Sequence, residues 1–140
     1  MKPKHQLAHM RAAHIYAELS SARRLKVGAL IVKDDRIISI GYNGQPSGWD
    51  NNCEVELEDG SLKTKPTVLH AEMNAISKLA KSSESGDGSS IFITHAPCMD
   101  CAKMIYQSGI TNVYYATDYR DIAGKDFLKQ CGIRVEQIDV

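Results

Sequence analysis

Apolar and polar positions follow two different periods along the chain. Between residues 5 and 21, apolar side chains recur every two or three residues with no glycine or proline, which predicts a first helix. The stripe expected to face the core consists of Leu7, Met10, Ala13, Ile15, Ala17 and Leu19. The β-branched segments 27–33 and 36–41 are separated by Asp34-Asp35, and this pattern predicts a β-hairpin.

The second half of the chain alternates helical patterns with short apolar runs. Thr67 is a suitable cap for a helix that extends to Lys81. Further helices are predicted at 98–108 and 121–130, and strands at 91–94, 113–116 and 133–138. A hairpin followed by alternating helices and strands predicts a three-layer α/β/α sandwich around a mixed, five-stranded sheet.

Two polar segments interrupt this pattern. Residues 45–65 are too long for a simple connection and form a candidate functional loop. Residues 82–89 are rich in serine and glycine, as is typical of a flexible link. A chain of 140 residues can bury one core but not two, so we expect a single domain over residues 1–140 with a folded surface of about 7,000 Å².

Composition narrows the classes of function. Apolar residues make up 43% of the chain, and 17 basic residues balance 17 acidic ones, which excludes a disordered chain and leaves no broad basic surface for nucleic acid. No apolar run approaches the roughly 18 residues of a membrane span, and no signal-peptide core follows the basic start. We therefore expect a small-molecule substrate, no membrane or nucleic-acid partner, and a place in the cytoplasm, that of the host if the chain is viral.

Two short motifs carry the chemistry. His70-Ala-Glu72 and Pro97-Cys98-Met-Asp-Cys101 together match the H-x-E and P-C-x-x-C signature of zinc nucleobase deaminases. Three ligands, His70, Cys98 and Cys101, leave a fourth position for water, as in a catalytic zinc site. Glu72 can then act as the base that takes a proton from this water and returns it to the substrate.

Other interpretations of the same residues remain open at this stage. The two cysteines could form a thioredoxin-like redox pair, although Pro97 precedes them instead of lying between them. His70 and Glu72 could simply cap a helix and complement its dipole, and His95 could replace His70 as a ligand. A zinc-bearing module without catalysis is a further alternative. The remaining cysteines and histidines are expected to have structural roles only. Cys53 is interpreted as a loop thiol and Cys131 as a packed core thiol, and the faces of the first helix carry His5, His9 and His14.

Four segments resemble the deoxycytidylate (dCMP) deaminases of phages and bacteria, within the cytidine deaminase-like superfamily. They are residues 26–32, 36–46, 70–76 and 97–110. The resemblance covers nearly the whole chain, and it implies the cytidine deaminase-like fold and hydrolysis of dCMP to dUMP and ammonia. Deamination of another cytosine or purine nucleoside or nucleotide is the alternative within this superfamily.

The resemblance also implies a set of substrate contacts. Asn43 would contact the deoxyribose, unless 41–44 is merely a turn, and the backbone at Ala71 and around Thr94, His95 and Ala96 would hold the pyrimidine. Tyr115 and Tyr119 would wall the nucleotide pocket or pack in the sheet. Candidates for the 5′-phosphate are Arg23, Arg24, Lys26 and Arg120.

Regulation and assembly are implied in the same way. The family is commonly a homo-hexamer that dCTP activates and dTTP inhibits, and a triphosphate effector could bring Mg²⁺. The segment Gly41, Tyr42, Asn43 and Gly44 would participate in effector binding. Some relatives hold a second, structural zinc, but Ala22 stands at one of the cysteine positions and the loop has only Cys53, so we expect one zinc per chain.

Overall fold

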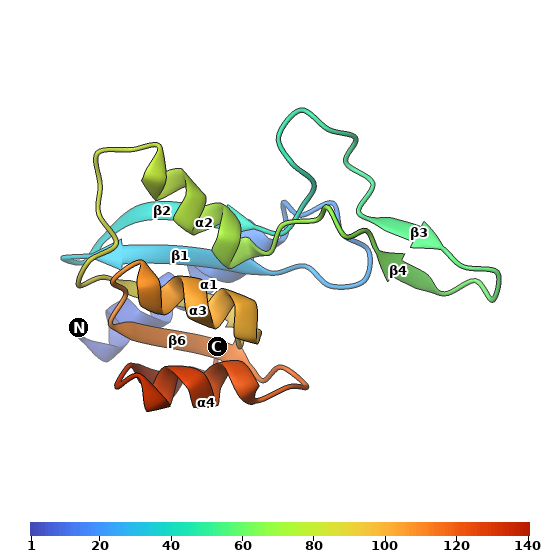
Figure 1. The fold of residues 1–140 in the computed structure, drawn as a ribbon. Coiled ribbons are helices and arrows are strands. Elements are labelled where there is room, and N and C mark those ends of the chain that lie inside the picture. Colours follow the sequence, from blue (N-terminus) through green and yellow to red (C-terminus); the bar gives the residue numbers. More distant parts are fainter.

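A mixed five-stranded sheet organises the chain, and the computed structural model describes all 140 residues (Figure 1). The strand order is β2-β1-β5-β6-β7. β1 is antiparallel to both β2 and β5, whereas β5, β6 and β7 are parallel. The strands are β1 Gly28–Lys33, β2 Arg36–Tyr42, β5 Ser90–His95, β6 Asn112–Thr117 and β7 Arg134–Gln137.

Helices cover both faces of this sheet. α1 (Pro3–Ala17) lies on one face, and α2 (Ala71–Ala80), α3 (Met99–Gln107) and α4 (Ala123–Gln130) lie on the other (Figure 1). The predicted three-layer sandwich with a mixed sheet is therefore confirmed. None of the helices combines the length and the apolar character that crossing a lipid bilayer requires.

Two buried clusters lie on the two faces because successive strand residues point in opposite directions. The cluster under α1 includes Leu30, Val32, Phe92 and Tyr114 from the strands. The cluster under α2, α3 and α4 includes Ala29, Ile31, Ile91, Ile93 and Val113. Burial on both faces explains why the central strands are continuous apolar runs.

The first helix buries a narrower stripe than the sequence predicted. Met10, Ala13 and Ala17 face the sheet, at the spacing of three and four residues that places side chains on one helix face. Ile15 and Leu19 are 62% and 57% exposed, so their assignment to the core was wrong. The helix also begins two residues earlier than predicted and ends at Ala17 instead of residue 21.

The predicted hairpin between β1 and β2 is confirmed, and its turn is attached to α1. Asp34 and Asp35 both have positive φ, 52° and 58°, as a two-residue turn of this hand requires. The carboxylate of Asp35 contacts His5 Nδ1 at 2.7 Å and His9 Nε2 at 3.0 Å. These two histidines therefore fasten the hairpin turn to the helix.

Two predicted helix starts were too early. Leu69 forms two backbone hydrogen bonds with Gly44, 3.1 and 2.8 Å long, which keep the chain extended up to His70. Helix α2 therefore begins at Ala71, and the Thr67 hydroxyl donates to Gln45 Oε1 instead of capping it. Helix α4 begins at Ala123, two residues later than predicted.

The segment predicted as a loop contains regular structure. β3 (Glu54–Glu56) and β4 (Leu62–Thr64) pair as a two-stranded antiparallel ribbon, closed at its base by the Lys65 N–H bond to the Cys53 carbonyl. We call residues 53–65 the ribbon. It projects from the body of the molecule (Figure 1), and the accessible surface is 7865 Å², larger than the size of the chain predicts.

Candidate active site

Two helix N-termini converge on a cluster of three metal-ligating side chains. His70 is the N-cap of α2, Cys98 is the N-cap of α3, and Cys101 lies in the first turn of α3. His70 Nδ1 is 3.6 Å from Cys98 Sγ and 3.3 Å from Cys101 Sγ, and the three ligand atoms lie within 4.8 Å of one another. Tetrahedral zinc with ordinary bond lengths would separate a nitrogen and a sulfur ligand by about 3.5 Å, so the three residues fit this metal.

Two glycines allow the elements that carry these ligands to approach closely. A Cβ on Gly41 of β2 would lie 2.2 Å from the Ala71 carbonyl oxygen, at the start of α2. A Cβ on Gly124 of α4 would lie 2.3 Å from the Pro97 carbonyl oxygen, directly before Cys98. Backbone therefore packs on backbone at both helix starts, which fixes the ligands by contacts far from them in sequence.

The two thiols differ in acidity because they share one proton. Hydrogen bonds from Cys101 and His70 lower the pKa of Cys98 to about 4. The bond to Cys98, followed by burial, raises the pKa of Cys101 above its ordinary value. A thiolate beside a thiol and an imidazole is a donor set in which a divalent cation can replace the shared proton.

Glu72 lies beside these ligands in the first turn of α2. Its side chain is buried, with only 4% of the residue exposed. Burial raises its pKa to about 7, against the opposing effects of a backbone N–H and of His70. A carboxyl group that gains and loses a proton near neutral pH is suited to general acid and base catalysis.

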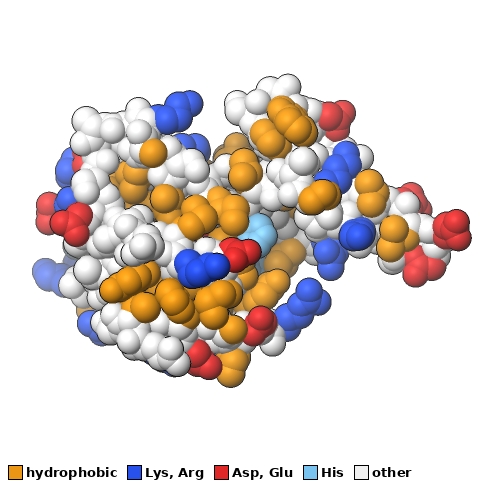
Figure 2. Space-filling view, in the orientation of Figure 1, with side chains coloured by type: hydrophobic (Ala, Val, Ile, Leu, Met, Phe, Trp, Pro, Cys, Tyr) orange, Lys and Arg blue, Asp and Glu red, His pale blue; other side chains and the backbone are white.

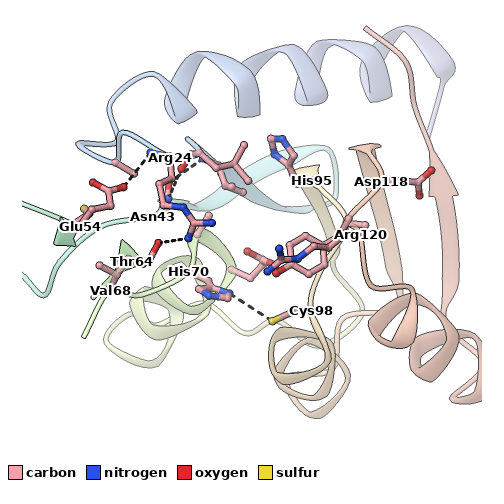
Figure 3. Close-up of a pocket in the computed structure, with 18 residues that line it drawn as sticks. Arg24, Asn43, Glu54, Thr64, Val68, His70, His95, Cys98, Asp118 and Arg120 are labelled. Atoms are coloured by element: carbon pink, nitrogen blue, oxygen red, sulfur yellow. Dashed lines mark hydrogen bonds between the residues drawn. The ribbon is translucent and has the colours of Figure 1, made fainter. Parts of the chain in front are cut away.

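A cavity of about 450 Å³ opens above Glu72, within the size range of small-molecule sites. Figure 2 shows the surface hollowed beside a histidine, between the body of the molecule and the ribbon. Besides Glu72 and the ligands His70 and Cys98, the predicted residues that line the cavity are Arg24, Asn43, Ala71, His95, Ala96, Tyr119 and Arg120 (Figure 3).

Three predicted contacts do not line the cavity. Tyr115 faces α4, where Lys125 Nζ lies 3.5 Å from its hydroxyl and 5.0 Å from its ring centre. Lys26 is exposed and lies outside the cavity lining. Thr94 is fully buried, and its hydroxyl accepts the Gly28 N–H at 3.2 Å. Tyr115 shares with Val113 the sheet face that α4 covers, and strand alternation therefore directs its side chain at that helix.

His95 lines the cavity without joining the metal ligands. Its Nδ1 lies 2.9 Å from the Thr94 hydroxyl. The oxygen of this hydroxyl accepts the Gly28 N–H, and its own proton remains available to donate to Nδ1. Burial, together with His14, lowers the pKa of His95, so the ring is neutral at neutral pH. When Nδ1 accepts this bond, the proton of the neutral ring is on Nε2, which can then act as a donor.

Asn43 organises the backbone at the rim of the cavity. Its Oδ1 accepts the Val27 N–H at 2.9 Å, and its Nδ2 donates to the Leu25 carbonyl at 2.8 Å. Both polar atoms are therefore used within the protein, although Oδ1 keeps a lone pair and Nδ2 keeps a proton. Asn43 thus holds the connection between α1 and β1 in addition to lining the cavity.

Sequence reasoning missed the residues that the ribbon brings to this site. Glu54 and Thr64 of the ribbon line the cavity, and so do Val68 and Asp118 from outside the ribbon. Glu54 alternates with Glu56 and Glu58 in sequence, which is typical of an exposed strand, yet Glu54 is 1% exposed. No local signal marks which of the three carboxylates is buried.

The two remaining cysteines lie outside the cluster of metal ligands, and one of the two expectations for them is confirmed, because Cys53 lies in a loop directly before β3. Cys53 is buried at the base of the ribbon, with its thiol directed at the Asn51 carbonyl. Cys131 is the C-cap of α4 and is partly exposed, so its assignment to the core was wrong. A helix end lies at the border of the packed region, which explains the difference.

Comparison with known proteins decides the family. Residues 3–117 match the family model described as the cytidine and deoxycytidylate deaminase zinc-binding region. The chain belongs to this family. It is therefore a deaminase, and the thioredoxin-like interpretation of Cys98 and Cys101 is set aside.

Individual relatives agree with this assignment. ComE operon protein 2 of Bacillus subtilis is 40% identical over 136 residues, which cover 94% of this chain and 69% of the relative. The deoxycytidylate deaminase of Enterobacteria phage T4 is 33% identical over 165 residues, covering 90% and 86%. The dCMP deaminase of cyanophage S-TIM5, solved in complex with dCMP and dUMP, superposes with a TM-score of 0.91 at 52% identity and covers 99% of each chain.

Proposed function

We propose that residues 1–140 act as one zinc-dependent domain that hydrolyses dCMP to dUMP and ammonia. One observation carries this proposal: buried Glu72 lies beside the His70, Cys98 and Cys101 cluster in the same cavity that Arg24 lines. The cavity thus combines a proton-transfer group, a metal-ligand set and a cation for a phosphate. The cyanophage relative, which was solved with dCMP and dUMP, supports this substrate.

The chemistry follows from the charge and burial of these groups. Zinc, when bound by His70, Cys98 and Cys101, supplies a Lewis acid that activates a water. Glu72 accepts a proton from this water while the oxygen of the water forms a bond to C4 of the cytosine. Glu72 then passes the proton to N3. The second proton of the former water, now on the hydroxyl at C4, then moves through Glu72 to the amino group, the bond from C4 to nitrogen breaks, ammonia leaves, and the C4 carbonyl of dUMP forms. The sum is dCMP plus water giving dUMP plus ammonia.

The lining residues have distinct roles in this proposal. The backbone around Ala71 and Ala96 holds the pyrimidine, with Tyr119 as a wall and His95 as a donor. The free proton and lone pair of Asn43 face the deoxyribose. Arg24, with Arg120, binds the 5′-phosphate, because guanidinium groups suit phosphate oxygens. Thr94 contributes by orienting His95, whereas Tyr115 and Lys26 lie outside the lining and have no part.

Effector control by dCTP and dTTP, with Mg²⁺ on the triphosphate, in a homo-hexamer acting in the cytoplasm, belongs to the same proposal. Its physical support is the attachment of segment 41–44 to α2. Asn74 Nδ2 donates to the Tyr42 carbonyl at 2.8 Å, and Gly44 pairs with Leu69. Any shift of this segment would therefore reach the helix that carries Glu72.

Turnover of dCMP, free cytidine and a short single-stranded DNA, compared at one salt concentration, tests the substrate. We expect dCMP to be preferred over cytidine, because Arg24 can bind its phosphate. We expect it to be preferred over the strand, because the chain has no net charge with which to attract a polynucleotide. Equal turnover of cytidine would contradict phosphate recognition, and preference for the strand would indicate an editing enzyme. Bound zinc without any turnover would indicate a non-catalytic module.

A further inference from the structure

The base of the ribbon contacts Arg24 at two separate points. Glu54 is the first residue of β3 and Thr64 is the last residue of β4, and the two are directly paired across the ribbon. Oε2 of Glu54 accepts the backbone N–H groups of Arg23 and Arg24 at 2.9 and 3.1 Å. The Thr64 hydroxyl accepts a bond from Arg24 Nη1 at 3.0 Å (Figure 3).

Arg23 and Arg24 are thereby assigned different tasks. The Arg23 side chain turns to the other carboxylate oxygen, with Nε 3.3 Å from Glu54 Oε1 and Nη2 3.0 Å from Asn52 Oδ1. Arg23 does not line the cavity, whereas Arg24 does. Arg24 uses only one guanidinium donor on Thr64, and the others remain free for a phosphate.

A buried carboxylate is costly unless it is fully paired, and Glu54 is 1% exposed. Two backbone amides and one guanidinium compensate its charge. These bonds join the ribbon to the connection between α1 and β1, a segment with no regular structure of its own. Together with the Thr64 bond to the guanidinium, they fix the backbone and the side chain of Arg24 at the cavity.

We propose that Glu54 and Thr64 are positioning residues that hold Arg24 in place for the 5′-phosphate, so that the ribbon determines preference for a nucleoside monophosphate. This inference rests on the proposed dCMP deaminase function. It gives a role to segment 45–65, whose length alone marked it as a candidate. Neither residue takes part in the chemical step at C4.

The test compares dCMP with deoxycytidine, which lacks the phosphate. In Glu54→Ala we expect the KM for dCMP to rise about 10- to 100-fold, the effect of losing a charge-assisted hydrogen bond, with kcat nearly unchanged. Thr64→Val should raise the KM for dCMP by a smaller factor, and Thr64→Ser, which keeps the hydroxyl, should return this KM to the wild-type value. The kcat/KM for deoxycytidine should stay constant throughout, whereas a merely structural role would lower it too.

Two further variants separate the possible causes. Glu56→Ala removes an exposed carboxylate from the same strand and should change neither substrate's kinetics. When Arg24→Ala is already present, adding Glu54→Ala or Thr64→Val should cause no further loss, because both act through Arg24. Additive losses, or equal losses on dCMP and deoxycytidine, would overturn the inference.

The result stays decisive if one variant folds poorly. Thr64 is exposed, so Thr64→Val tests the guanidinium contact without affecting a core. Glu54→Asp, which keeps the charge but withdraws the acceptor from the two amides, should reproduce the KM increase. A wild-type enzyme with no preference for dCMP over deoxycytidine would instead refute the proposed function, before any ribbon variant is measured.

Discussion

Glu72 and Glu54 are buried to nearly the same extent, 4% and 1% exposed, yet their pKa values move in opposite directions. Burial raises the pKa of Glu72 to about 7. Burial acts in the same sense on Glu54, but the backbone N–H groups of Arg24 and Arg23 and the Arg23 side chain outweigh it, and its pKa lies below the ordinary value. Partners, and not burial alone, therefore decide whether a carboxylate exchanges protons or serves as a permanent anion.

The two carboxylates mark two ends of one cavity. The end with Glu72 has the metal ligands on helix N-termini and is built for chemistry. The end with Glu54 consists of irregular backbone and the ribbon, held by bonds from side chain to backbone. If this division is correct, changes at the first end should abolish turnover, and changes at the second should alter only which substrate is used.

Metal removal should have the largest effect. Dialysis against a strong chelator should abolish deamination, and zinc at about one equivalent per chain should restore it, because three protein ligands hold the ion. Elemental analysis before and after dialysis provides the measurement. A chelated protein that still deaminates dCMP would contradict the metal site.

Glu72→Gln should have the second-largest effect. We expect a loss in kcat of about 10³- to 10⁴-fold, at the upper end of what general acid and base catalysis contributes. The amide keeps the size of the side chain but cannot transfer protons, so zinc content and nucleotide binding should survive. A variant that retained more than about a tenth of the wild-type rate, a barrier change below about 1.4 kcal/mol, would show that Glu72 is not the proton shuttle.

The pH dependence of stability in metal-free protein should reveal the raised pKa of Glu72. A carboxyl with a folded pKa of about 7 contributes stability that is complete below its unfolded value near 4.5 and is lost as pH rises through 7. Relative to Glu72→Gln, the wild type should lose up to about 3 kcal/mol between pH 4.5 and 8. Urea unfolding of both proteins across this range measures it, and a constant difference would contradict the burial effect.

Arg24→Ala probes the other end of the cavity. We expect the KM for dCMP to rise about 10- to 100-fold while kcat for dCMP and kcat/KM for deoxycytidine change little, since the lost contact is with the phosphate. Arg11→Ala, an exposed arginine on α1 outside the cavity, is the matched control. A fall in kcat for both substrates would break the proposed division between the two ends.

The smallest effect is expected from the charge of Glu54. Its lowered pKa means that the carboxylate contributes stability above its ordinary pKa and loses it as pH falls through the lower folded value. Glu54→Gln keeps an acceptor for the two amides, although these bonds are no longer charge-assisted, and it loses the pair with half-exposed Arg23, which is itself worth about 1 kcal/mol at most. In metal-free protein the difference from wild type should therefore shrink in acid, opposite in sign to that of Glu72→Gln.

The chemical end of the cavity could be predicted because its residues are close together in sequence and lie at helix starts. Cys98 and Cys101 are three residues apart, a spacing that places both on one side of a first helical turn, and His70 and Glu72 form an equally short motif. The alternation of apolar runs likewise determined the sheet, its two covered faces and the hairpin between β1 and β2. These features depend on local periods that any fragment of the chain would display.

The nucleotide end was decided by tertiary structure. The choice of Arg24 over Arg23 depends on a carboxylate about 30 residues away, and the burial of Glu54 depends on where the ribbon folds back. The start of α2 at Ala71 depends on the pairing of Gly44 with Leu69, which no helix propensity encodes. The sequence by itself determined which atoms could bind a metal and move a proton, because each of the two motifs is a short run of neighbouring residues. Only the folded chain decided which charges are paired and which line the cavity, because pairing between distant segments has no local signature.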